Sequence, residues 1–408
     1  MKTIRLAPVD LHSIRLDIPL PFDLVDSHGV LLAQKGFVFR NESTLNGLAE
    51  RGRGFFVDFS DLSNPRLRVA QRDYVNQLIY RLESQGTLGD LAKVHLKYSN
   101  SSNSEDVDTR LLDWPNIVER CNSMLHTRDS KFFYQRLESM VAILTHEVNA
   151  NPDKTLLALF YLSQEQQPHL YSTTHSILVC AICALTASTV LHWSDADVNL
   201  LMRCALTMNI GMVDLQDALT FQKNATDLSQ RVLINEHAAM SGHLLEMFGV
   251  DDNDWLNIVR SHHGTIKDPI RCKHRSERLV GLLHRVDVFT AKLSSRLSRI
   301  SLPSSQAMKS IYFDELEKID VMGAAILKAV GVYRPGSFVK LASGEIAVVI
   351  RRGKNTSAPT TVIILNKNGI PVASDIVRET SDKNFAITSV VPSDEIRVTL
   401  NLDKLLKI

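Results

Sequence analysis

Apolar residues recur every three or four positions through the middle of the chain, from about residue 111 to residue 331. The segments RLESMVAILTHEV (136–148) and LLALFYL (156–162) show this period clearly. Because an α-helix completes a turn in about 3.6 residues, the spacing predicts helices that each bury one face. Turn-forming stretches such as NANPDK (149–154) separate these segments. We therefore predict a helical domain over 111–331.

The two ends of the chain show a different period, in which apolar and polar residues alternate. Near the start, LPFDLVDSHGVLLAQKGFVF (20–39) reads as two strands around the turn residues DSHG, and GFFVDFS (54–60) as another strand. Near the end, FVKLASGEIAVVIRRGKNTSAPTTVIILNKNGIPVA (338–373) alternates around SGE and KNG turns. These patterns predict a β-rich N-terminal module over 1–65 and a C-terminal β subdomain over 332–408.

A helical and then polar stretch, 66–110, connects the first module to the helical domain. Residues 66–96 carry the helical period, whereas KYSNSSNSEDVDTR (97–110) contains almost no large apolar side chain. Such a composition cannot bury enough surface to fold and is typical of linkers. The predicted fold class is mainly α, with a small β module at each end.

Charge and cysteine content narrow the classes of partner and compartment. The 46 Lys and Arg residues balance 45 Asp and Glu residues, so no charge excess favours nucleic acid or an anionic membrane surface as a partner. Five cysteines, an odd number, suit a reducing compartment, and we expect a cytoplasmic protein. Polar residues interrupt the apolar segment HSILVCAICALTASTVLHW (175–193), which therefore predicts a buried helix and no membrane span.

Histidines in the helical region occur within a recognisable order of short motifs. The order is YSTTHS (171–176), NIG (209–211), HAAMSGHLLE (237–246), IVRSHHG (258–264) and VDVFTAKLSSRLSR (286–299). Over about residues 165–365 this resembles the HD-GYP branch of the HD phosphohydrolases. The resemblance implies an HD-domain-like helical bundle. It also implies a site in which transition-metal ions activate water to hydrolyse the bacterial second messenger cyclic di-GMP.

The resemblance assigns roles to seven positions of this chain. Five match metal ligands of the family: His175, His237, His262, His263 and Asp287. Arg296 and Arg299 match arginines that lie near substrate phosphates in the family. An arginine suits that role because its planar fork donates two parallel hydrogen bonds to a phosphate.

Three further positions depart from the family motif LLHDIGK, which here reads LTMNIGM. Met208 replaces the metal-binding histidine, Asn209 the bridging aspartate and Met212 the lysine. An amide is neutral and cannot offset the repulsion between two cations. The GYP loop is also missing, because GTIKDPIRCKHRSERL (264–279) follows the histidine pair. The site is therefore predicted to hold no metal, or one transition-metal ion (iron, manganese or zinc) on His237, His262 and His263.

Three hypotheses follow from this pattern. The first is a degenerate HD-GYP protein of cyclic di-GMP signalling that has lost phosphodiesterase activity and acts by binding. Its partner would be a protein, or the cyclic dinucleotide held by Arg296 and Arg299. The second is an active phosphodiesterase with an unusual mononuclear site. The third is a scaffold whose histidines share no common cavity.

Overall fold

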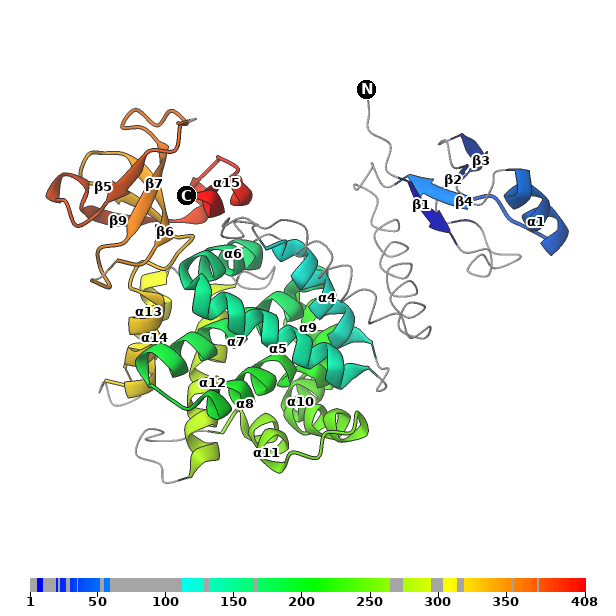
Figure 1. The fold of residues 1–408 in the computed structure, drawn as a ribbon, viewed down its shortest axis with the longest axis horizontal. Coiled ribbons are helices and arrows are strands. Elements are labelled where there is room, and N and C mark those ends of the chain that lie inside the picture. Colours follow the sequence, from blue (N-terminus) through cyan, green and yellow to red (C-terminus); the bar gives the residue numbers. More distant parts are fainter. Residues whose placement is uncertain are drawn as a thin grey trace, which may run out of the picture. The chain divides into compact units, whose positions relative to one another are not determined.

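The computed structural model describes most of the chain from residue 112 onwards and parts of the first 58 residues (Figure 1). The described residues are 6–9, 20, 23–26, 30–34, 36–51, 55–58, 112–127, 132–164, 168–264, 274–294, 304–313, 319–353, 355–372 and 374–408. The chain divides into two compact units, Met1–Asp108 and Thr109–Ile408. The described elements are mainly helices, with one small sheet in each unit, which confirms the predicted mainly α fold class. The predicted helix over 66–96 and linker over 97–110 lie outside the described residues.

The N-terminal unit contains a four-stranded antiparallel sheet and one helix. Its strands, in the order β1-β4-β2-β3, are β1 (Leu6–Val9), β2 (Leu24–Val25), β3 (Leu31–Ala33) and β4 (Phe55–Asp58), and its helix is α1 (Glu42–Arg51). The hairpin between β2 and β3 is closed by Asp26, whose side chain accepts a hydrogen bond from the Val30 amide at 2.8 Å. The rings of Phe39 and Phe55 are buried together, with centroids 6.1 Å apart. The alternating pattern around DSHG therefore corresponds to a hairpin.

Twelve α-helices are described in the second unit, and eleven of them precede its sheet (Figure 1). They are α4 (Trp114–His126), α5 (Phe133–Ala150), α6 (Pro152–Gln164), α7 (Tyr171–Leu185), α8 (Asp195–Thr207), α9 (Val213–Phe221), α10 (Leu228–Met247), α11 (Asn253–Ser261), α12 (Arg275–Leu293), α13 (Ser304–Tyr312) and α14 (Val321–Val330). A short terminal helix, α15 (Leu402–Lys407), follows the C-terminal sheet. Two short 3-10 segments, η2 (Pro168–Leu170) and η4 (Ile210–Met212), join helices, and a π-helical segment, η3 (Thr186–Val190), continues α7.

Helix α7 forms the centre of this unit. All fifteen of its residues are buried, and it packs against α4, α5, α6, α8 and α12. Two stretches, Tyr171–Val190 and Asp195–Phe221, are long and apolar enough to cross a membrane by length and composition. Burial within the unit covers 83% and 67% of their most apolar windows, respectively. Residues 175–193 therefore contribute a core helix, as predicted.

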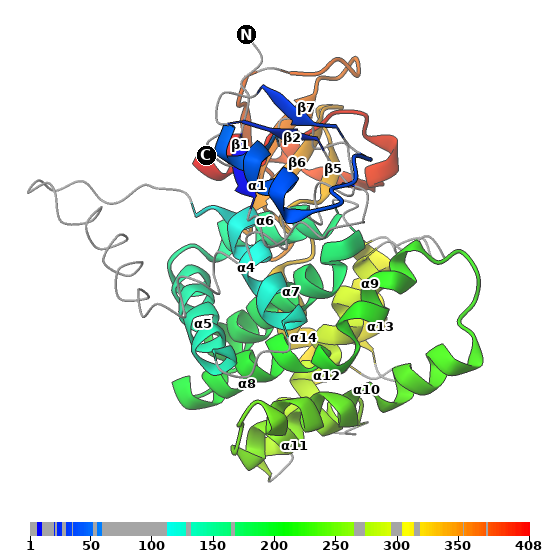
Figure 2. The same cartoon turned by 90° about the vertical axis from the view of Figure 1, so that its right-hand side faces the viewer.

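Side-chain caps fix where the helices that surround the candidate site begin. Asp227 caps α10 by accepting from the Gln230 amide at 2.8 Å, and the Gln230 side chain accepts from the Asp227 amide in return. Asp252 caps α11 by accepting from the Trp255 amide at 3.1 Å. Each cap satisfies backbone N–H groups that have no partner within the helix. Helix α11 then packs against both α10 and α12 (Figures 1 and 2).

The C-terminal part forms a five-stranded antiparallel sheet. Its strands, in the order β8-β7-β6-β5-β9, are β5 (Phe338–Leu341), β6 (Ile346–Arg351), β7 (Thr360–Leu365), β8 (Val377–Glu379) and β9 (Ile387–Val391). Short turns η5 (Lys383–Phe385) and η6 (Ser393–Glu395) flank β9. Side chains from one face, including Val348 and Ile350, join the core of the helices. Val339 and Val349 are buried in a separate cluster. The sheet is thus integrated into the helical unit.

Candidate metal centre

Three of the predicted ligands meet at one point of the helical unit. His237 lies in α10, and His262 and His263 directly follow the last residue of α11. The Nε2 atom of His237 is 3.2 Å from Nε2 of His262 and 3.1 Å from Nε2 of His263. One nitrogen from each ring lies within 4.8 Å of the other two. The hypothesis that these histidines share no cavity is therefore wrong for this trio.

Backbone carbonyl groups fix the orientation of two of these rings. Nδ1 of His237 lies 2.5 Å from the carbonyl oxygen of Ile234, and Nδ1 of His262 lies 2.7 Å from that of Val259. Because a carbonyl oxygen only accepts, each Nδ1 carries the proton and donates it. Each neutral ring then carries a lone pair on its Nε2 atom, and the lone pairs of His237 and His262 point towards each other. Two lone pairs at 3.2 Å repel unless a cation lies between them.

Burial keeps the three rings neutral near pH 7. It lowers the pKa of His237 and His263, and it lowers the pKa of His262 to about 4 with help from the neighbouring His263. Neutral imidazole is the form that binds metals. A tetrahedral ion with metal–nitrogen bonds of about 2.0–2.1 Å separates its ligand nitrogens by about 3.3 Å. The two Nε2 separations that involve His237 are close to that value, and one nitrogen of each ring lies within 4.8 Å of the others, so the three rings can converge on one ion.

The other two predicted ligands form a direct hydrogen bond. Nε2 of His175 in α7 lies 2.7 Å from Oδ1 of Asp287 in α12, and both residues are buried. The ring of Tyr171 stacks on that of His175, with centroids 5.9 Å apart. Burial alone would raise the pKa of Asp287, but the hydrogen bond from His175 and the charges of nearby histidines lower it to about 2. The carboxylate of Asp287 is therefore ionised and already engaged by His175.

The substituted motif lies where α8 ends. Met208 and Asn209 are buried, Met212 is half-buried, and Oδ1 of Asn209 has no hydrogen-bond partner. The turn η4 follows them and packs against α10. Gly211 allows this close approach: its amide donates to Oγ of Ser241 at 2.9 Å, and a Cβ at this position would lie 2.9 Å from the His237 carbonyl oxygen.

A fourth histidine near the trio was not identified from the sequence. His284 lies in α12, one turn before Asp287, and its ring centroid is 6.0 Å from that of His263. Nδ1 of His284 is buried and has no hydrogen-bond partner. The available signal was its spacing of three residues from Asp287, which places both side chains on one helix face.

Several predicted features lie outside the described residues. Arg296 and Arg299 fall in the undescribed stretch 295–303, and most of the segment that replaces the GYP loop falls in 265–273. The predicted phosphate contacts of these arginines therefore stay predictions.

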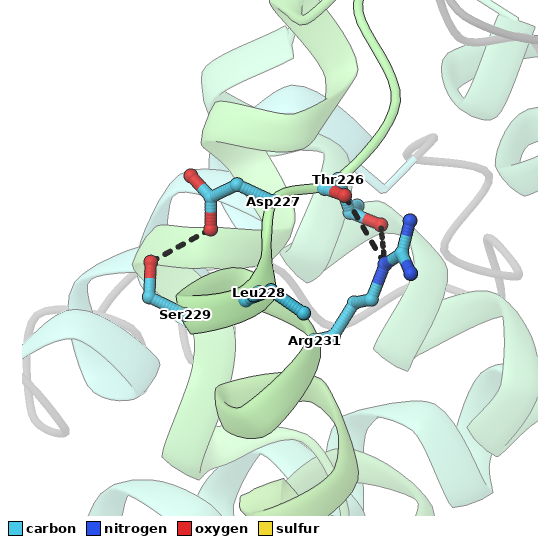
Figure 3. Close-up of a pocket in the computed structure, with 5 residues that line it drawn as sticks. All are labelled: Thr226, Asp227, Leu228, Ser229 and Arg231. Carbon is cyan, nitrogen blue, oxygen red and sulfur yellow. Dashed lines mark hydrogen bonds between the residues drawn. The ribbon is translucent and has the colours of Figure 1, made fainter.

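A surface hollow at the start of α10 shows no comparable chemistry (Figure 3). It is lined by Thr226, Asp227, Leu228, Ser229 and Arg231. Nε of Arg231 donates to the Thr226 carbonyl oxygen at 3.1 Å, and Oγ of Ser229 donates to the Asp227 carboxylate at 2.7 Å. These polar groups stabilise the helix start, so the hollow does not compete with the histidine trio as a candidate site.

Comparisons with known proteins leave the family open. No family model matches the chain, and no curated protein matches it. The chain is similar to a solved structure described as Bd1817, a HDG"Y"P protein from Bdellovibrio bacteriovorus. The similarity has 12% identity and a TM-score of 0.37, and it covers 79% of this chain and 98% of that one. The function is therefore inferred from the site residues themselves.

Proposed function

We propose that the helical unit is a degenerate HD-GYP-like module that holds one transition-metal ion and acts by binding, without hydrolysing cyclic di-GMP. The ion would be held by His237, His262 and His263. The observation that carries this proposal is the convergence of three Nε2 atoms, two of them opposite Nδ1 groups that donate to backbone carbonyls. That arrangement is typical of histidine ligands, whose second nitrogen is fixed by a hydrogen bond.

Electrostatics argues against a second ion beside the first. Two dications about 4 Å apart repel each other by on the order of 15 kcal/mol at an effective dielectric constant of 20. A bridging carboxylate offsets this repulsion in two-metal sites, but Asn209 supplies a neutral amide at the corresponding position. Asp287 does not replace the bridge, because its Oδ1 is bound to His175. A bound ion would act as a Lewis acid, and here we expect it to hold α10 and α11 together.

The proposed partner of the helical unit is a protein or cyclic di-GMP. Loss of the two-metal site with retention of the helical scaffold favours a role in which a protein partner or cyclic di-GMP is bound and left intact. Arg296 and Arg299 are the proposed contacts for nucleotide phosphates, because arginine binds phosphate through paired hydrogen bonds.

Metal analysis and nucleotide assays on the full chain test the proposal. We expect about one zinc, iron or manganese ion per chain, and no linear product from cyclic di-GMP. His262→Ala should remove the ion, whereas the control His243→Ala, on the exposed side of α10, should retain it. Two ions per chain together with cleavage of cyclic di-GMP that His262→Ala abolishes would refute the proposal.

A mononuclear phosphodiesterase is the second candidate function. The observation that favours it is the exposure of His263, which would let water reach an ion at the trio. Catalytic zinc sites keep such an open position beside three protein ligands. Cleavage of cyclic di-GMP with one ion per chain would select this function over the first.

A further inference from the structure

We infer that His284 is a fourth ligand of the ion at the trio, giving a site of four imidazole nitrogens that leaves no coordination position for water. This inference rests on the proposed binding of one ion by His237, His262 and His263. Such a site is closed in the sense of structural zinc sites, whereas catalytic sites leave one position for water or substrate.

The position of the His284 ring supports this assignment. Its centroid lies 6.0 Å from that of His263, and within the trio the centroids are 4.1 to 5.1 Å apart. Two imidazoles on one tetrahedral ion have centroids about 5 Å apart, as follows from metal–nitrogen bonds of about 2.0–2.1 Å. The ring contact with His263 therefore places His284 beside the trio, although its nitrogens lie outside the group within 4.8 Å, and a change of its side-chain rotamer would have to bring one of them to the ion.

The buried nitrogen of His284 supplies an independent observation. Nδ1 of this ring is buried without a hydrogen-bond partner. A buried polar atom left unsatisfied costs about 1–3 kcal/mol, so a native structure seldom keeps one without a role. Coordination to an ion would satisfy this atom. The nearby carboxylate of Asp287 does not compete for the position, because His175 holds it at 2.7 Å.

Four neutral imidazoles would also determine which metals the site accepts. Imidazole nitrogen suits zinc, cobalt, nickel and copper, whereas manganese and magnesium favour carboxylate and water oxygens. We therefore expect the site to prefer zinc or cobalt to manganese. A closed ligand set would also account for the proposed lack of hydrolysis, since no water would be bound to the ion.

X-ray absorption spectroscopy of the full chain loaded with Zn²⁺ or Co²⁺ alone tests the inference. The wild-type spectrum should show four imidazole ligands and no water, a result that needs no variant. His284→Ala should keep one ion with three imidazoles and a water-derived oxygen, and should bind Co²⁺ about tenfold more weakly or worse. His274→Ala, at the exposed start of the same helix, is the matched control and should behave as wild type.

The outcomes separate this inference from the proposed function. Three imidazoles and one water in the wild-type spectrum, or unchanged Co²⁺ affinity in His284→Ala, would overturn the fourth ligand and leave the single-ion proposal standing. A wild-type chain that binds none of zinc, cobalt, iron and manganese would overturn both.

Discussion

Replacing Gly211 by alanine should disturb the candidate site from a distance. A Cβ there would lie 2.8 Å from the Ser241 amide nitrogen and 2.9 Å from the His237 carbonyl oxygen. Ordinary contacts begin at 3.4 Å, and both neighbours are backbone atoms, so α10 must move by about half an ångström. Overpacking of this kind costs about 1–3 kcal/mol of unfolding free energy. Because His237 belongs to the displaced turn, its Nε2 should also move away from His262 and His263.

Urea denaturation and Zn²⁺ titration together measure both effects. We expect Gly211→Ala to lower the urea midpoint and to weaken Zn²⁺ binding by the folded protein. Gly323→Ala is the matched control, because its Cβ would meet the Ile311 carbonyl oxygen where α13 and α14 pack. That variant should lose stability while its folded form keeps the Zn²⁺ affinity. Wild-type stability and affinity in Gly211→Ala would refute a tight approach of η4 to α10.

Two further predictions concern other polar groups of the helical unit. Burial alone would lower the pKa of His126, but the hydrogen bonds to Asp217 and to the Asn122 backbone, together with the charges of Asp217 and Asp214, raise it above its ordinary value of 6.5. Its stabilising contribution should therefore be complete below the unfolded pKa of about 6.5 and fade as pH rises through the folded value. Urea midpoints measured from pH 5 to 9 should show this dependence, and Asp217→Asn should remove or reverse it, because burial then dominates the pKa of His126. Met208→His combined with Asn209→Asp should raise the metal content towards two ions per chain. An unchanged number of ions per chain would contradict the explanation that these two substitutions prevent a second ion from binding.

The periodicity of the sequence was sufficient to predict the main elements. Apolar spacing of three to four residues predicted helices such as α5, and the alternating segments at both ends predicted hairpins. It did not predict that the C-terminal sheet shares the core of the helices. In β6, four consecutive residues are buried, and alternation alone does not say which element covers each face of a strand.

The candidate site could be predicted only in part. The adjacent pair His262 and His263, with the motif order, was enough to propose that His237 joins them. The carbonyl groups that orient the rings are backbone atoms, which leave no signature in the residue types. His284 was missed for a related reason: a single histidine in a helix is common, and only the packing of α12 against α11 brings it near the trio.

Our proposal that one ion binds, on the histidine trio alone, makes a specific demand on Asp287. With no cation beside it, a carboxylate buried in α12 would be uncompensated, and the hydrogen bond from His175 at 2.7 Å meets that demand. Removing one partner of such a buried pair typically costs about 3–5 kcal/mol, which is the loss of unfolding free energy we expect for His175→Ala.

The pH dependence of the unfolding free energy of His175→Ala shows whether the buried charge of Asp287 causes the loss. In the wild type, Asp287 has a pKa of about 2, so its contribution is present above the unfolded pKa of about 3.9 and is lost as pH falls towards 2. In His175→Ala, burial should raise this pKa above the unfolded value, so the variant should lose stability as pH rises from 4 to 7. Adding Asp287→Asn should remove that pH dependence, because the amide carries no charge to be buried. A loss below about 1 kcal/mol that is independent of pH would show that the pair does not compensate for a missing cation.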